Sequence, residues 1–137
     1  PCIGEREREM STSALSAGTI SIVNVRRHRP HEHPHATHVY CGRWRGHRVP
    51  TGWITRFELG NPFVVNAQCS REEAIAQFRT WLRGKCVAPY GVEYHYVIEL
   101  ASWYHQGADL VLGCHCAPQA CHCEVIADAI RGYAARM

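Results

Sequence analysis

The fold of this chain is decided by residues 109–130, which read DLVLGCHCAPQACHCEVIADAI. The segment begins with a short apolar run, residues 110–112, whose composition indicates a buried strand. It ends with apolar residues at helical spacing, from Val125 to Ile130. Four of the eight cysteines lie between these two parts, within residues 114–123. The sequence therefore predicts a strand, a turn rich in cysteine and histidine, and a helix.

The predicted turn has the side chains of a metal site. Cys114 and Cys116 are two residues apart, so a strand that continues past Gly113 points both sulfur atoms to one face. Cys121 and His122 begin the helix and could complete the tetrahedral set of thiolates and imidazole that zinc prefers. We predict a zinc site, with iron as the alternative ion, at Cys114, Cys116, Cys121 and His122, and with Cys123 and His115 as reserve ligands.

Two other interpretations of the turn stay open. A thiol at a helix N-terminus has a lowered pKa, so Cys121 beside His122 could be a nucleophile without any metal. Alternatively, the cysteines are small buried residues that bind nothing. If a metal is present, Glu124 is a candidate general acid or base beside a metal-bound water, and His122 could also move protons.

Composition limits the protein class. A length of 137 residues suits one domain, and the net charge is +3. The chain has no apolar run of about 20 residues and no apolar signal sequence at its charged start, so we expect no membrane partner. In the reducing cytoplasm that we expect, or the host cytoplasm if a phage encodes the protein, clustered cysteines are more often metal ligands than disulfides.

The rest of the chain predicts a single small α/β domain at residues 19–137, after a disordered tail at 1–18. Its partly parallel sheet has strands at 20–26, 37–41 and 110–114, and a strand or ladder edge at 53–59. Three helices are expected. The first follows a capping box at residues 70–73 and stops at Gly84, the second spans 93–106, and the third follows the cysteine turn. If strands 20–26 and 110–114 are parallel neighbours, Asn24 and Arg26 approach that turn.

Several short motifs resemble an uncharacterised family of small bacterial and bacteriophage proteins that is known as a domain of unknown function. The similarity runs from about Ile22 to Ile130. The motifs are V-N-x-R at 23–26, Y-x-G-R at 40–43, G-N-P-F at 60–63, S-R-E-E-A at 70–74, F-x-x-W-L at 78–82 and C-x-C-x-P-x-x-C-H-x-E at 114–124. The resemblance implies that Asn24, Arg26, Gly42, Arg43, Asn61, Cys114, Cys116, Cys121 and His122 converge. It leaves Cys123 as a peculiarity of this chain.

These residues predict a pocket beside the metal. Arginine forks bind phosphate and amides bind base edges, so we expect Asn24, Arg26, Arg43 and Asn61 to bind a nucleotide or nucleobase. We favour a small phage-type metal enzyme, with DNA-base modification of the deazaguanine type as one context. The alternatives are a non-enzymatic zinc module that binds nucleic acid or a host protein, and a thiolate enzyme. Arginines interleaved with aromatic residues between 26 and 56 fit nucleic acid, but an arginine-rich surface around a few core aromatics explains the same pattern and is the interpretation that we prefer.

The same region contains five histidines at 28–38. Such loops bind metal weakly, and we assign this one no physiological site.

Overall fold

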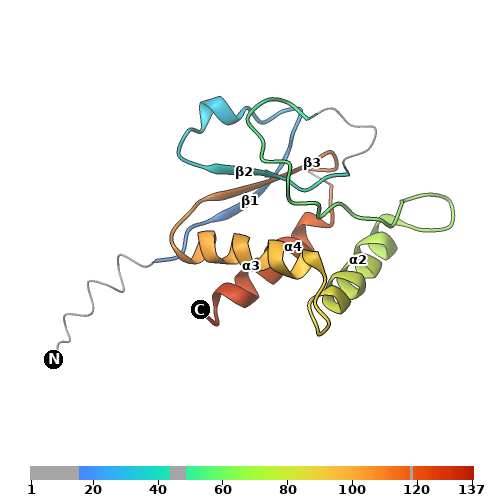
Figure 1. The fold of residues 1–137 in the computed structure, drawn as a ribbon. Coiled ribbons are helices and arrows are strands. Elements are labelled where there is room, and N and C mark those ends of the chain that lie inside the picture. Colours follow the sequence, from blue (N-terminus) through green and yellow to red (C-terminus); the bar gives the residue numbers. More distant parts are fainter. Residues whose placement is uncertain (1–15, 44–48, 118) are drawn as a thin grey trace.

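Three parallel strands form the sheet, and the strand that comes last in the sequence lies in the middle (Figure 1). The computed structural model describes residues 16–43, 49–117 and 119–137. Strand β3 (Leu110–Cys114) pairs with β1 (Ile20–Asn24) on one side and with β2 (Thr37–Tyr40) on the other. Both outer strands are aligned with the same β3 residues, so the carboxyl ends of all three strands meet at one edge.

Three α-helices lie on one side of this sheet (Figure 1): α2 (Arg71–Lys85), α3 (Val92–His105) and α4 (Cys123–Ala134). A 3-10 turn, η2 (Pro30–Glu32), precedes β2. The predicted small α/β fold, with three helices and a strand-to-helix turn at residues 114–123, is confirmed. The sheet is parallel throughout the described residues, whereas the sequence had predicted a partly parallel one.

Local signals explain where the helices begin and end. Ser70 caps α2, since its hydroxyl accepts a hydrogen bond from the Glu73 amide at 3.1 Å while the Glu73 carboxylate accepts one from the Ser70 amide at 2.7 Å. Gly84 was expected to stop this helix, but it lies inside α2, which continues to Lys85. Gly107, at a φ of 105°, follows α3 as predicted.

The predicted strand at residues 53–59 is not formed. Only Ile54 pairs with β2, as an isolated bridge to Val39, and it exchanges two hydrogen bonds with the β2 backbone. Trp53, Phe57 and Leu59 are nevertheless buried. The alternation that predicted a strand therefore reflects side chains that point into the protein from an extended loop, not a ladder of hydrogen bonds.

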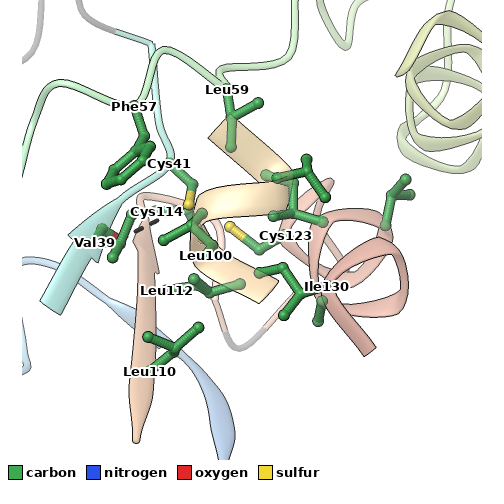
Figure 2. Packing of buried hydrophobic residues seen from close by; sticks show 14 of the residues in the cluster. Val39, Cys41, Phe57, Leu59, Leu100, Leu110, Leu112, Cys114, Cys123 and Ile130 are labelled. Carbon is green, nitrogen blue, oxygen red and sulfur yellow. Dashed lines mark hydrogen bonds between the residues drawn. The ribbon is translucent and has the colours of Figure 1, made fainter. Parts of the chain in front are cut away.

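The sheet separates two apolar clusters because side chains alternate along each strand. Leu110, Leu112 and Cys114 belong to the large cluster that includes the helices (Figure 2). Val111 belongs to a smaller cluster on the other face, with Trp53 and Tyr40. Four cysteines lie in the large cluster among leucines and isoleucines, so their sulfur atoms are shielded from water.

Part of the sequence interpretation lies outside the described residues. This applies to residues 1–15 of the predicted tail and to Trp44 and two arginines of the arginine-aromatic region at 44–48. Of the tail residues that are described, Gly18 donates a backbone hydrogen bond to the Tyr104 carbonyl at 2.9 Å. Within the described residues, no helix has the length and apolar character required to span a bilayer.

Candidate metal centre and adjoining pocket

Three buried sulfur atoms meet at the junction of β3 and α4. The Sγ atoms of Cys114, Cys121 and Cys123 all lie within 4.8 Å of one another, and each residue is at most 2% exposed. Cys114 ends β3, Cys121 ends the turn and Cys123 begins α4. The Sγ atoms of Cys114 and Cys121 are 3.3 Å apart. Three thiols gathered without a disulfide in a dry site match the ligand chemistry of zinc.

A fourth cysteine, Cys41, adjoins this group and was missed from the sequence. It directly follows β2, is fully buried, and its sulfur interacts with that of Cys123. Figure 2 shows the Cys41 and Cys123 side chains facing each other between the strands and α4. The signal was available, because the strand predicted at 37–41 ends on Cys41 and parallel strands bring their carboxyl ends together.

The thiols of Cys114 and Cys121 differ in the direction of their pKa shifts. Hydrogen bonds from Cys121 and Cys123 lower the pKa of Cys114, and the backbone around Ala117 and Cys116 lowers it further. The pKa of Cys121 is raised, first because its thiol is the partner of the Cys114 thiolate. That direction is opposite to the lowered pKa that the nucleophile hypothesis required at Cys121. Hydrogen bonds from the neighbouring thiols therefore favour ionisation at Cys114 over Cys121.

Two of the four predicted metal ligands lie outside this sulfur group. Cys116 is half-buried and is not among the clustered sulfur atoms in the described residues. The ring of His122 is buried, and its Nε2 donates a hydrogen bond to the Cys41 carbonyl at 2.5 Å. Burial lowers the pKa of His122, and the ring also packs edge-on against Phe78. In this arrangement His122 ties the start of α4 to the end of β2.

The remaining reserve ligand, His115, packs edge-on against the ring of Tyr40, with 5.9 Å between centroids. It also lies on the wall of a pocket beside the sulfur group.

This pocket has a volume of about 250 Å³. One wall comes from the cysteine turn, a second from the loop at 60–65 and a third from the start of α2. Its lining residues include Arg43, Asn61, Arg71, Cys114, Cys116, Cys121 and His122. Cys114 and Cys121 therefore belong both to the sulfur group and to the pocket wall. The pocket therefore adjoins a group of side chains that could hold a metal ion.

Two guanidinium groups reach the pocket without a carboxylate partner in the described part of the chain. Arg43 donates from Nε to the Asn61 carbonyl at 2.7 Å and from Nη2 to the Phe63 carbonyl at 3.1 Å. Arg71 donates from Nη1 to the Ala120 carbonyl at 3.3 Å. Backbone carbonyls orient both groups but leave their positive charge uncompensated, which favours an anion in the pocket.

The side-chain amides that were predicted to bind substrate are hydrogen-bonded to the backbone instead. Asn24 Nδ2 donates to the Ala117 carbonyl at 3.0 Å, and its Oδ1 accepts from the Arg26 amide at 2.9 Å. Asn61 Nδ2 donates to the Ala74 carbonyl at 3.2 Å, and its Oδ1 accepts from the Phe63 amide at 2.8 Å. These two residues hold the loops that form the site.

Arg26 and Glu124 are both exposed. Glu124 accepts a hydrogen bond from the Cys121 amide at 3.4 Å, and so it caps the first turn of α4.

Comparison of the sequence with known protein families identifies the family of this chain. A family model matches residues 23–132, which is most of the chain. The chain belongs to the DUF4326 family. DUF4326 is described as a domain of unknown function. No curated protein and no solved structure matches the chain.

The DUF4326 match includes every residue of the sulfur group and of the pocket. Seven of the nine residues that were expected to converge in this DUF4326 domain line the pocket, whereas Asn24 and Arg26 do not. Asn24 instead contacts the back of the cysteine turn. The seven residues that line the pocket therefore lie together. Asn24, at the end of β1, holds the cysteine turn from outside the pocket.

Proposed function

We propose that this DUF4326 domain is a small zinc enzyme that acts on a nucleotide or nucleobase. Cys114, Cys121 and Cys123 hold the ion, and Arg43 and Arg71 hold a phosphate group in the adjoining pocket. The observation that carries the proposal is the shared wall, since Cys114 and Cys121 contribute to both the sulfur group and the pocket. Three protein ligands leave zinc a fourth position, which is the arrangement of catalytic rather than structural sites.

The chain's own residues have defined tasks in this proposal. The two arginines neutralise and orient the phosphate, because backbone carbonyls already fix their guanidinium groups. His122 keeps the metal-bearing turn attached to β2, and Glu124 stands at the Cys121 amide as the candidate proton carrier. Zinc would supply a polarised substrate group or an activated water. DNA-base modification, deazaguanine chemistry included, is the reaction class to test first.

A second function is favoured by the position of Cys41. If its buried sulfur fills the fourth position, four thiolates enclose the ion and the site is structural. The domain would then be a zinc-stabilised module whose pocket binds an anionic group of nucleic acid or of a host protein.

Cobalt substitution separates the two functions. The intensity of the thiolate-to-cobalt charge-transfer band counts sulfur ligands, and Cys41→Ser should leave it unchanged if three cysteines bind. A loss of about one quarter of the band in Cys41→Ser would favour the enclosed site. Failure of the chain to bind zinc or cobalt at all would overturn both functions and leave a thiolate at Cys114 as the reactive group.

Ligand binding is tested separately with nucleoside monophosphates and inorganic phosphate. Arg71→Gln should weaken binding at least about tenfold, because it removes a charge-assisted contact. Arg83→Gln is the matched control: it lies in the same helix but lines a different pocket. Equal binding by wild type and Arg71→Gln would contradict the assignment of the phosphate site.

A further inference from the structure

The histidine-rich loop closes on β2 to form a second cluster of metal-binding side chains. His28 follows β1 in a turn, and its Nε2 lies 2.9 Å from the Nε2 of His38 in β2. His33 stacks on His28, with 4.4 Å between ring centroids and 15° between ring planes. The sequence analysis had assigned no physiological site to this loop, but contact between two ring nitrogens requires one of them to present a lone pair.

This cluster is separate from the sulfur group. His38 and Tyr40 are two residues apart in β2 and point to the same face, whereas Val39 points to the helix-covered face. Trp53 lies edge-on to both imidazole rings, with centroids 5.2 Å from His38 and 6.0 Å from His28. The sheet itself thus stands between the histidines and Cys114.

We propose that His28 and His38 bind one divalent ion of the late first transition series through their Nε2 atoms. Imidazole is a preferred ligand of zinc, copper and nickel. Two imidazoles on one such ion, each about 2.0–2.1 Å from it, have nitrogens about 3 Å apart when the bond angle is near a right angle. The observed separation of 2.9 Å is close to that distance, so the two nitrogens need not move apart and the rings need only rotate until both lone pairs face the ion.

Binding of the ion requires a change of tautomer in one of the two rings. In the hydrogen-bonded pair one ring carries its proton on Nε2. When the ion binds, that proton moves through solvent to Nδ1 of the same ring, and both rings coordinate as neutral ligands. No proton is lost overall and no oxidation is involved.

Trp53, whose ring contacts both imidazoles, carries a polar group without a partner in the portion of the chain that the structure describes. Trp53 Nε1 is buried and has no hydrogen-bond acceptor among the described residues. A buried indole N–H requires an acceptor, and a water molecule on the ion is a suitable one. His33, stacked on His28, stiffens the loop that carries one ligand. The ion would fasten the loop between β1 and β2 to the sheet.

Zinc titration of the zinc-loaded protein tests this site independently of the cysteines. Wild type should bind one equivalent beyond that at the sulfur group, and His28→Gln should lose only that additional equivalent. His95→Gln, an exposed histidine of α3, is the matched control and should bind as wild type does. In Cys121→Ser the histidine equivalent should persist, so failure of the proposed cysteine site would not remove it.

Imidazole NMR provides the second measurement. Zinc should shift the ring signals of His28 and His38 together, and His38→Gln should abolish the shift at His28. An unchanged zinc stoichiometry in His28→Gln, or zinc binding that leaves both ring signals in place, would overturn the proposal.

Discussion

Cys123 and Cys116 differ in the surroundings of their sulfur atoms, although both lie in the same turn. Cys123 is fully buried within the sulfur group, whereas Cys116 is half-buried and lines the pocket. We therefore predict that Cys123→Ala lowers zinc affinity more than about tenfold while Cys116→Ala leaves it near that of wild type. Competition with a chromophoric chelator measures both constants. The reverse order would show that the spacing of the motif, and not the sulfur cluster, identifies the ligands.

Asn24 is a single residue that stabilises the cysteine turn through its side-chain amide. Its side-chain amide donates to the Ala117 carbonyl and, at 3.4 Å, to the His115 carbonyl. Asn24→Ala removes the side-chain donor to the partly buried Ala117 carbonyl, so we expect a loss of about 1–3 kcal/mol in the free energy of unfolding. Urea denaturation provides the value. Ser21→Ala, at an exposed position of the same strand, is the control and should change stability little.

At the scale of the element, the middle strand depends on one residue without a side chain. A Cβ added at Gly113 would lie 2.5 Å from side-chain atoms of Trp53 and Val25. That distance is too short for the buried Trp53 ring and the Val25 side chain to keep their positions. Gly113→Ala should therefore destabilise the protein by about 1–3 kcal/mol.

Gly132 supplies the matched comparison. It lies inside α4, and a Cβ there meets nothing within 4 Å. Gly132→Ala should stabilise the protein by about 0.5–1 kcal/mol, since alanine is the better helix former. Thermal melts of the two variants should shift in opposite directions, and a stabilised Gly113→Ala would contradict the packing of Trp53 on the sheet.

The helices and strands also show which sequence signals are sufficient to predict secondary structure. The capping box at Ser70 and the apolar spacing in α4 are local, so they predicted both helices correctly. Residues 53–59 have the alternation of a strand, yet pairing depends on a neighbour distant in sequence, and only Ile54 finds one. In the site, local spacing located the cysteine turn. Local spacing alone did not identify Cys41, which the pairing of the predicted strands could have indicated, or the backbone partners of Asn24 and Asn61, because these contacts join segments 13–93 residues apart.

At the scale of the whole molecule, the proposed ion joins the sheet to the last helix. Zinc binds the gathered thiolates of the folded protein more tightly than the dispersed thiolates of the unfolded chain, so this difference in binding energy adds to folding stability. We expect a chelator to lower the melting temperature of the zinc-loaded protein by more than about 5 °C. Calorimetry with and without chelator measures the shift. The Cys114→Ser variant should show a clearly smaller response, since only the proposed histidine site remains, and an equal response in that variant would place the stabilising ion outside the sulfur group.

The order of the strands has a consequence for biosynthesis. β1 and β2 leave the ribosome early, but they are not neighbours in the sheet, and both require β3 as their partner. A nascent chain that has not reached residue 110 therefore has two strands with unsatisfied edges and a Cys41 thiol that lacks the other cysteines of the sulfur group. The sheet and the gathering of sulfur atoms are completed in the same late event, once residues 110–123 emerge. Until then, a chaperone that covers exposed strand edges would protect the thiol as well.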